Sequence, residues 1–432
     1  MINLTKDCSK LKKKVTFVVF FSVAAVVGSS CSTTTNSNVS TASKAPPGMP
    51  SFYAIPNSIP DKPGQFIKSE PVPVSGVNAN AYRVMYTSLT LQNKVVPVTG
   101  LVFVPKAAPP KGGYDVVDWS HGTNGMSNSC APSLDPSSAV ESLSSLIDKG
   151  YEVTASDYQG EGTPPGILAY LVGVLAARNS IDIVSAVHND SFFHASNKYI
   201  VWGHSEGGQT ALFTWDIGRQ YDTNLDIMGV VAGAPPSQFE FIYSALKSSP
   251  YAFYLYMAGE GFNIAYGNKA APLNEVTTPL GLKLLPDLEK GCFDYLMKTL
   301  DKYNISEIIP KDPFTIPAWK TLLQENDPEN FSTSSGIPLL IIQGTADEQI
   351  PPISTQLLAT HLCSIGTNLE RWMYPGMNHT GVIPVSTQDM LTWMNTKFNP
   401  TNTLPPGWHP TGLPNVLDQN CSTPGGFTTP SP

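Results

Sequence analysis

The stretch Lys198-Tyr-Ile-Val-Trp-Gly-His-Ser-Glu-Gly-Gly-Gln209 decides the fold. Its first half is a short apolar run of β-branched and aromatic residues, which is typical of a buried strand. The glycines that follow bracket Ser205 and open a helical stretch, so the serine is expected at a tight turn between strand and helix. Such a turn exposes the hydroxyl, and the helix N-terminus favours negative charge that develops nearby. The stretch therefore predicts a nucleophilic serine at the end of a sheet strand.

Strands and helical segments alternate along the chain on both sides of this stretch. Near-continuous apolar runs such as PLLIIQG, residues 338–344, are typical of strands that are buried on both faces. The alternation indicates an α/β fold, in which a mostly parallel sheet is covered by helices on both faces. Strands are predicted at 81–90, 95–105, 115–120, 152–158, 199–204, 227–234, 338–343 and 369–374, and helices at 139–149, 168–188 and 206–218.

The alternation stops between residues 234 and 336, where about a hundred residues pass without a clear buried strand. Aromatic residues are frequent there, and the pattern predicts a mainly helical insertion between two strands of the sheet. Two interpretations of these aromatic residues stay open: they pack against the core, or they form a lid that lines an apolar substrate pocket. The densest group consists of Tyr251, Phe253, Tyr254, Tyr256 and Phe262.

A serine hydroxyl is a weak nucleophile and needs a base that is itself oriented by a carboxylate. Three histidines follow Ser205 along the chain: His361, His379 and His409. His379 lies in a loop directly after a predicted strand, which fits the chain order serine, acid, histidine. His361 lies within a helical stretch and His409 in an irregular tail, where surface or packing roles are more usual. The sequence therefore predicts His379 as the base.

The acid is expected at the end of the strand that precedes this histidine. The run PLLIIQG leads into Thr345-Ala-Asp-Glu348, which places Asp347 at the carboxyl end of a strand, where catalytic groups gather in such sheets. The neighbouring Glu348 is the structural alternative, expected as a solvated side chain. Asp347 is therefore predicted to orient His379.

Backbone N–H groups that stabilise an oxyanion are the remaining requirement of such a site. One donor is expected from Glu206, directly after the nucleophile, and a second from the loop that follows an early strand. The segment VVDWSHGTNG, residues 116–125, supplies this loop. We predict Thr123 as the donor, with Gly122 allowing close approach. A glycine-rich turn without a catalytic role stays open as the alternative.

The first thirty residues have the composition of an export signal. Four lysines between positions 10 and 14 precede an apolar run over 15–27, and small residues follow it. The run is short for a membrane-spanning helix, although a retained anchor stays open. Behind Cys31 the chain is rich in Ser, Thr and Asn, which is typical of a flexible tether. The segment resembles a bacterial lipoprotein signal with lipidation at Cys31, and ordinary cleavage near 25–30 is the alternative.

Charge and cysteine content argue against several classes of site. The net charge is −8, and loss of the lysine-rich first thirty residues would make it about −12. Such a balance gives no basic surface for nucleic acid. Four cysteines remain when Cys8 leaves with the leader and Cys31 is set aside, and none has the close spacing of a zinc site. Two disulfides are expected from the four, with three pairings open.

Six stretches of the chain together resemble the secretory lipase family, which includes fungal lipase A enzymes and their bacterial relatives. They lie in the family's order between roughly residues 80 and 395. The resemblance implies an α/β-hydrolase fold with a helical cap inserted before the acid-bearing strand. The lipoprotein-like leader and the irregular tail depart from the family pattern. The six stretches are WSHGTNG, CAPS, GYEVTASDYQGEGTP, GHSEGGQ, GTADEQIP and PGMNHTG.

The resemblance also implies particular residues, and together with the leader, the tether and the tail read from composition it gives a domain plan. It implies the triad Ser205–Asp347–His379 and the disulfides Cys130–Cys292 and Cys363–Cys421. The plan consists of an export signal at 1–30, a tether at 31–50, a core at 51–235 and 336–400, a helical cap or lid at 236–335, and an irregular tail at 401–432.

The expected activity is hydrolysis of carboxylic esters of lipids or other lipophilic esters through an acyl-enzyme, without a cofactor or metal. A short-chain esterase, a peptidase or an acyltransferase with the same triad stays open, because these enzymes share the chemistry and differ in pocket shape. A non-catalytic surface lipoprotein that binds apolar ligands is the alternative from another class. We expect the bacterial envelope as the location, with an anchor at Cys31, or otherwise a secreted or periplasmic protein.

Overall fold

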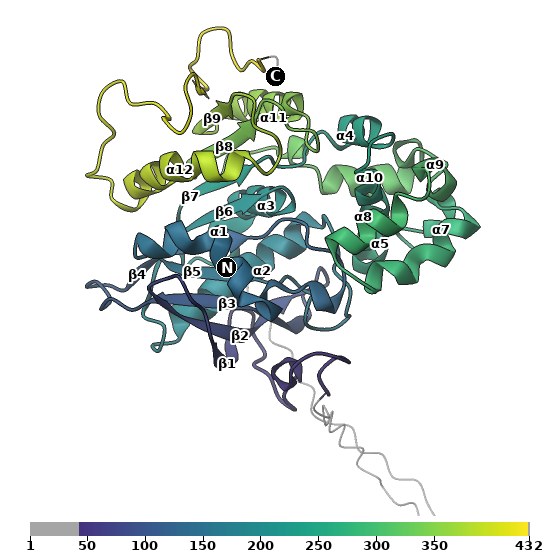
Figure 1. The fold of residues 1–432 in the computed structure, drawn as a ribbon, viewed down its shortest axis with the longest axis horizontal. Helices are drawn as coiled ribbons and strands as arrows, with labels where there is room; N and C mark the ends of the chain where they lie inside the picture. The colour runs from purple at the N-terminus through teal and green to yellow at the C-terminus, as the bar shows by residue number, and fades with distance from the viewer. Residues whose placement is uncertain (1–42, 431–432) are drawn as a thin grey trace, which may run out of the picture. The chain divides into compact units, whose positions relative to one another are not determined.

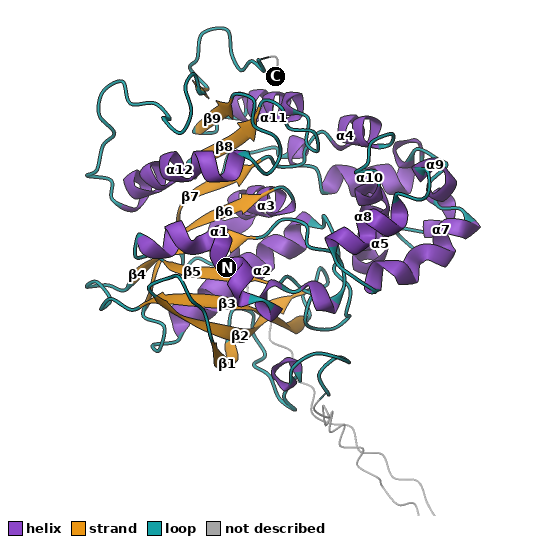
Figure 2. Ribbon diagram, in the orientation of Figure 1, coloured by secondary structure: helices purple, strands orange, loops and turns teal. Residues whose placement is uncertain are grey.

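The computed structural model describes residues 43–430, and the predicted export signal and Cys31 lie outside this range. The described chain is built on a ten-stranded sheet (Figures 1 and 2). The strands lie in the order β1-β2-β3-β5-β4-β6-β7-β8-β9-β10. Their bounds are β1 Phe66–Val72, β2 Ala79–Leu89, β3 Val95–Pro105, β4 Tyr114–Ser120, β5 Glu152–Ser156, β6 Ala195–His204, β7 Asp226–Gly233, β8 Leu339–Gly344, β9 Leu369–Tyr374 and β10 Leu417–Asn420.

The central part of the sheet, from β5 through β4, β6, β7 and β8 to β9, is parallel. The strands β1, β2 and β3 extend it antiparallel on one side, and β10 pairs antiparallel with β9 on the other. Because parallel strands end at the same edge, the loops after β4, β6, β8 and β9 meet there. These four loops carry the residues of the predicted site.

Helices cover both faces of the sheet and bury its apolar side chains. One core cluster joins α2 (Gly173–Asn189), α3 (Glu206–Tyr221) and α11 (Pro352–Ser364) to one face. A second cluster joins α1 (Pro136–Asp148) and α12 (Val382–Phe398) to the other face. Neighbouring residues of one strand point to opposite faces, so Val230 belongs to the first cluster and Val231 to the second. The α/β class predicted from the sequence is confirmed.

A chain of short helices lies between β7 and β8, to the right of the sheet in Figure 1. Their apolar side chains pack on one another, on residues 167–172, which precede α2, and on the first turn of α2. These helices are α4 Phe239–Leu246, α5 Phe253–Tyr266, α6 Leu273–Val276, α7 Pro279–Leu284, α8 Phe293–Leu300, α9 Ile305–Ile308 and α10 Pro317–Glu325. The 3-10 turn Leu285–Glu289 lies between α7 and α8.

Two sequence-based expectations differ from the structure. The helix predicted at 168–188 begins at Gly173, because residues 168–172 form an irregular segment in which Leu168 N–H donates to the carbonyl of Met126. The sequence also missed the edge strands β1 and β10. β10 lies in the tail that was expected to be irregular, where it pairs with β9.

Both disulfides have the pairing that the family resemblance implies. Cys130–Cys292 joins the loop after β4 to the start of α8, and Cys363–Cys421 joins α11 to the residue after β10. The first bond therefore ties the predicted oxyanion loop to the inserted helices. Among residues 43–430, no helix combines the length and apolar character needed to cross a bilayer.

Candidate active site

Ser205 lies between β6 and α3, and its backbone is held in an unusual conformation. Its φ is 59° and its ψ is −124°, in a region that residues with a side chain rarely adopt. The turn is fixed from both sides: Ser205 N–H donates to Gly233 O at 2.9 Å, and Ser205 O accepts from Gly208 N–H at 2.8 Å. The strain is therefore maintained by the neighbouring strand and by the first turn of the helix.

Two glycines allow this turn to pack closely. A Cβ atom on Gly203 would lie 2.0 Å from the carbonyl oxygen of Gly207. A Cβ atom on Gly207 would lie 1.9 Å from the carbonyl oxygen of Ser120, at the end of β4. Any side chain at either position would force backbone segments apart, so both glycines are required by the approach of α3 to the sheet.

Asp347 and His379 lie together after β8 and β9, and both are buried. The Nδ1 atom of His379 is 3.0 Å from Oδ1 and 2.9 Å from Oδ2 of Asp347. The carboxylate also accepts hydrogen bonds from the backbone N–H groups of Gln349 and Ile350 at 3.0 and 2.9 Å, and from Nε2 of Gln343 at 2.7 Å. Three further donors thus fix the carboxylate that holds the imidazole.

Two more side chains hold His379. The ring of His204 packs against it, with ring centres 4.6 Å apart, and burial lowers the pKa of His204 well below its usual range. Glu348 is exposed, as expected, but its Oε2 accepts the backbone N–H of His379 at 3.1 Å. Burial would raise the pKa of Glu348, but hydrogen bonds from backbone groups, including that of His379, lower it.

The predicted oxyanion loop lies directly against the nucleophile. A Cβ atom on Gly122 would lie 3.6 Å from Cβ of Ser205. In the described part of the chain, neither the N–H of Thr123 nor that of Glu206 donates to a protein acceptor. Both groups therefore have a hydrogen-bonding capacity that the fold itself does not use.

His121 of this loop forms a buried pair with Glu161. His121 Nε2 lies 3.4 Å from Glu161 Oε2, and the His121 ring stacks on Tyr158 with ring centres 4.3 Å apart. Burial lowers the pKa of His121 to about 4 and raises that of Glu161 well above its usual value. His121 is therefore neutral near pH 7, and its contact with Glu161 is not an ion pair.

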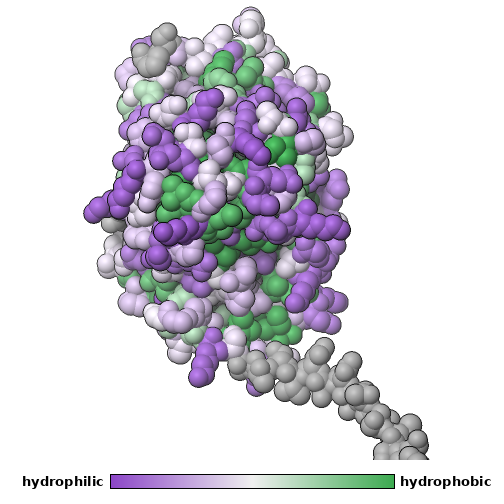
Figure 3. All heavy atoms as spheres, turned by 90° about the vertical axis from the view of Figure 1, so that its right-hand side faces the viewer, coloured by the Kyte–Doolittle hydropathy of each residue, from purple (hydrophilic) through white to green (hydrophobic). Residues whose placement is uncertain are grey.

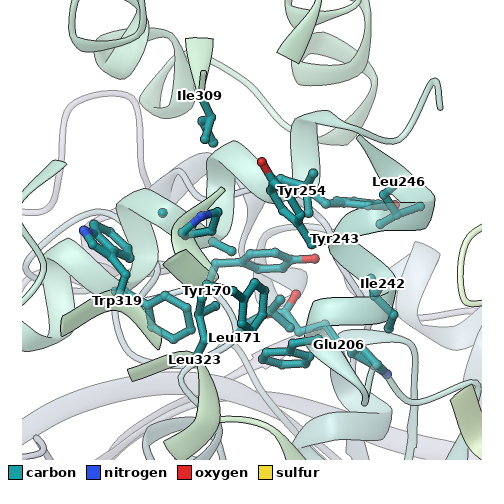
Figure 4. A pocket seen from close by; sticks show the side chains of 18 of the residues that line it. Tyr170, Leu171, Glu206, Ile242, Tyr243, Leu246, Tyr254, Ile309, Trp319 and Leu323 are labelled. Carbon is teal, nitrogen blue, oxygen red and sulfur yellow. The ribbon is translucent and has the colours of Figure 1, made fainter. Parts of the chain in front are cut away.

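An apolar cavity of about 90 Å³ extends from Ser205 into the inserted helices (Figure 4). We call it the apolar cavity. Half of its lining residues belong to α4, α5 and α10, and Tyr170, Leu171 and Glu206 also line it. Trp319 and Leu323 of α10 and Ile309 lie among the other labelled side chains of this wall.

A wider cavity of about 790 Å³ lies on the other side of Ser205, and we call it the wide cavity. Ser205, His379 and Thr123 all line it, so the cavity brings together the predicted nucleophile, base and oxyanion loop. Its outer walls come from the start of α1 and from α8, including the exposed Ser138 and the half-buried Phe293. This cavity is more polar than the first.

The two other histidines that follow Ser205, and Asp157 after β5, have structural contacts. His361 Nε2 lies 2.7 Å from the carbonyl oxygen of Phe331, and His409 is exposed in the tail. Asp157 is buried and accepts the backbone N–H of Ser133 at 2.8 Å. Sequence reasoning missed Gln343, which holds Asp347; its only signal is a polar side chain near the end of an otherwise apolar strand.

A comparison of the sequence with known protein families gives a match. The family model described as secretory lipase matches residues 137–405, which is more than half of the chain. This chain belongs to the secretory lipase family. Candida antarctica lipase A in its closed state superposes on this secretory lipase with a TM-score of 0.69 and 19% identity, over 80% of this chain and 84% of that chain. At this identity the likeness concerns the fold.

Two curated relatives cover most of this secretory lipase. A secreted triacylglycerol lipase of Malassezia globosa is 22% identical over 324 residues, which are 69% of each chain. A protein of Mycobacterium tuberculosis named "probable inactive lipase" is 22% identical over 361 residues, which are 78% of each chain. Membership of the family supports an ester hydrolase that acts on lipophilic esters.

Proposed function

We propose that this secretory lipase cleaves esters of lipids or other lipophilic acids through an acyl-enzyme on Ser205. The observation that carries the proposal is the combination of a strained serine turn with a buried Asp347–His379 pair, all at one edge of the sheet. The mycobacterial relative is named a probable inactive lipase, so activity has to be argued from the residues of this chain. All three residues are present in the chain order serine, acid, histidine. Ser205 and His379 line the same cavity, and Asp347 contacts His379. This arrangement supports activity.

The proton moves from Ser205 through His379. Because Asp347 accepts from Nδ1, the other ring nitrogen of His379, Nε2, carries the lone pair that takes the serine proton. The serine oxygen attacks the ester carbonyl, and His379 then returns the proton to the leaving alcohol. A water molecule repeats the sequence and releases the acid. Asp347 holds the ring and stabilises its charged form.

The negative charge on the carbonyl oxygen is stabilised by backbone N–H groups. Glu206 N–H and Thr123 N–H are the donors we propose, since both are unused within the described chain and both flank Ser205. Such donors each contribute about two to three orders of magnitude to the rate in comparable sites. The helix α3 begins at Glu206, and its N-terminus adds a favourable dipole.

Each of the two cavities would hold one part of the ester. The apolar cavity suits the acyl chain, because aromatic and aliphatic side chains of the inserted helices form most of its wall. The wide cavity suits the alcohol, because it contains His379, which must protonate the leaving oxygen. The inserted helices would then act as the cap predicted for residues 236–335.

The test combines covalent labelling with turnover. A fluorophosphonate probe should label the folded protein, and the protein should hydrolyse p-nitrophenyl esters from acetate to palmitate. The Ser205→Ala variant should lose both, with kcat/KM down by about 10⁴-fold or more. The Ser142→Ala variant removes an exposed serine from the wall of the wide cavity and should still be labelled. Labelling that survives Ser205→Ala would assign the nucleophile elsewhere and overturn the proposal.

We also propose that the protein is exported and anchored through a lipid on Cys31. The basic and apolar leader, the cysteine and the tether that follow it support this placement. Expression of the full chain with radiolabelled palmitate should give a labelled protein. The Cys31→Ser variant should lose the label and appear in the soluble fraction. Unlabelled wild-type protein in the medium would indicate ordinary cleavage.

A further inference from the structure

The apolar cavity contains a carboxyl group that the mechanism above does not use. Glu206 is the only acidic or basic side chain, tyrosines aside, among the described residues that line this cavity. Its side chain is buried, with 3% of the residue exposed. Its backbone N–H serves the oxyanion in the proposed mechanism, but this role asks nothing of the side chain. Alanine or glutamine at this position would supply the same N–H.

One oxygen of this carboxyl group, Oε2, has no hydrogen-bond partner among the described residues. The hydroxyl of Thr123 interacts with the carboxyl, and it also pairs with the hydroxyl of Tyr170 at 2.9 Å. The hydroxyl of Tyr254, on the same wall, donates to Gln349 at 2.9 Å. These three hydroxyls are therefore engaged, and Oε2 keeps an unused hydrogen-bonding capacity. Figure 4 shows Glu206 among the side chains that line the cavity.

The protonation state of the Glu206 carboxyl group decides which hydrogen bonds it can make. Burial raises the pKa of Glu206 to about 8, although its hydrogen bond with Thr123 lowers it in part. The group is then a neutral carboxylic acid near pH 7, with one O–H donor and a carbonyl acceptor. It can pair with a hydroxyl group without placing a charge beside the oxyanion.

The position of Glu206 determines where such a partner must lie. Glu206 directly follows Ser205, so its side chain starts beside the acylated oxygen rather than at the far wall formed by Trp319 and Leu323. A plain fatty acyl chain would cover the carboxyl group and leave it unpaired. An acyl chain with a hydroxyl a few bonds from the carbonyl would satisfy it.

We propose that the side chain of Glu206 selects esters whose acyl group carries a hydroxyl near the carbonyl, as in a 3-hydroxyacyl ester. This inference rests on the proposed function, since it names the acyl group that the Ser205 site accepts. Glu206 hydrogen-bonds this hydroxyl, and the rest of the chain lies among the apolar side chains. Pairing of an otherwise unpaired buried group favours the hydroxylated substrate by about tenfold.

The test measures a ratio within each protein. Ethyl 3-hydroxyhexanoate and ethyl hexanoate are hydrolysed in a pH-stat at pH 7 by the wild type and by Glu206→Met, Glu206→Gln and Leu323→Met. The wild type should show a kcat/KM ratio of about 10 in favour of the hydroxylated ester. Glu206→Met should bring the ratio to about 1 or below, whatever happens to the absolute rates, and Glu206→Gln should keep part of it. Leu323→Met, on the same cavity wall, should leave the ratio unchanged.

Two results would overturn the inference while the proposed function stands. One is a wild type that hydrolyses both esters through Ser205 with a ratio of 1 or less. The other is a Glu206→Met variant that slows both esters equally, which would limit the side chain to holding Thr123. If no ester is cleaved, the proposed function fails, and binding then decides the inference separately. The Ser205→Ala protein should be stabilised against heat more by 3-hydroxyhexanamide than by hexanamide, and equal shifts would refute selection by Glu206.

Discussion

The apolar cavity and the wide cavity share Ser205, Tyr254 and Gln349 but are built from different parts of the chain. The apolar cavity is formed mostly by the helices between β7 and β8, and its walls are aliphatic and aromatic. The wide cavity is formed by loops at the ends of β4, β6 and β9, together with α1 and α8. The inserted helices thus shape the acyl side, whereas the sheet edge carries the reacting groups.

This difference assigns catalysis to the sheet edge and substrate selection to the cavity walls. The groups at the sheet edge are held by strand ends and by backbone hydrogen bonds, as Asp347 is by the N–H groups of Gln349 and Ile350. Walls made of side chains on short helices can change shape by single substitutions without moving the strands. Changes at the sheet edge should therefore lower the rates on all esters together. Changes in the apolar cavity should alter the preference for the acyl chain, and changes in the wide cavity should alter the preference for the alcohol.

The largest effect is expected at Asp347. The Asp347→Asn variant should lose about 10³- to 10⁴-fold in kcat on every ester, because an amide no longer holds His379 in the productive tautomer. Glu348→Gln is the matched control, since Glu348 is exposed and contacts the backbone N–H of His379 rather than its ring. Its kcat should fall by less than about tenfold. Equal losses in the two variants would contradict the assignment of Asp347 as the acid.

A substitution in the apolar cavity should change chain-length preference. Ala258 of α5 lines this cavity, and the Ala258→Phe variant would fill part of it. The ratio of kcat/KM for p-nitrophenyl palmitate to that for the butyrate ester should fall by about 100-fold, because methylene groups lose their place in the pocket. Hydrolysis of the acetate ester checks that the catalytic groups still work. An unchanged ratio would place the acyl chain elsewhere.

A substitution in the wide cavity should change the preference for the alcohol part of the ester. Ser138 is exposed at the start of α1 and lines this cavity. The Ser138→Trp variant should lower kcat/KM for tributyrin relative to methyl butyrate by about tenfold, since a bulky side chain there obstructs a large alcohol. The palmitate-to-butyrate ratio should stay as in the wild type. A change in that ratio would show that the two cavities do not act independently.

The sequence predicted the sheet edge better than the cavities. Asp347 and His379 follow apolar strands, and a strand end in a parallel sheet determines which residues meet. The edge strand β1 was missed because its sequence, FIKSEPV, alternates poorly and contains Pro71. β10 was missed because only Leu417 in it is apolar, and its place depends on pairing with β9 and on the nearby Cys363–Cys421 bond.

The burial of Glu206 could not be predicted from the sequence. An acidic residue at the first position of a helix is usually exposed, where it interacts favourably with the helix dipole. Here the inserted helices cover it, and they belong to a part of the chain without regular periodicity. The wall of the apolar cavity depends on contacts such as that between Tyr170 and Thr123, which lie far apart in the sequence.

A further effect is expected on the pH dependence of stability, and it tests whether the apolar cavity is dry. Glu206 has a usual pKa of 4.5 and a pKa of about 8 when buried in the folded protein. Between these values the unfolded chain has lost this proton and the folded protein keeps it. The contribution of Glu206 to stability is therefore fully present below pH 4.5 and is lost as the pH rises toward 8, by at most about 1.4 kcal/mol per pH unit.

Glu206→Gln removes this titration and should flatten the decline between pH 5 and pH 8. The variant keeps part of the decline because other buried carboxyls, Asp118 and Asp182 among them, also have pKa values raised to about 7 by burial. Urea unfolding at several pH values measures both slopes. Asp301→Asn, at an exposed position after α8, is the control and should follow the wild type. Parallel curves for Glu206→Gln and the wild type would mean that water reaches the carboxyl and that the apolar cavity is not dry.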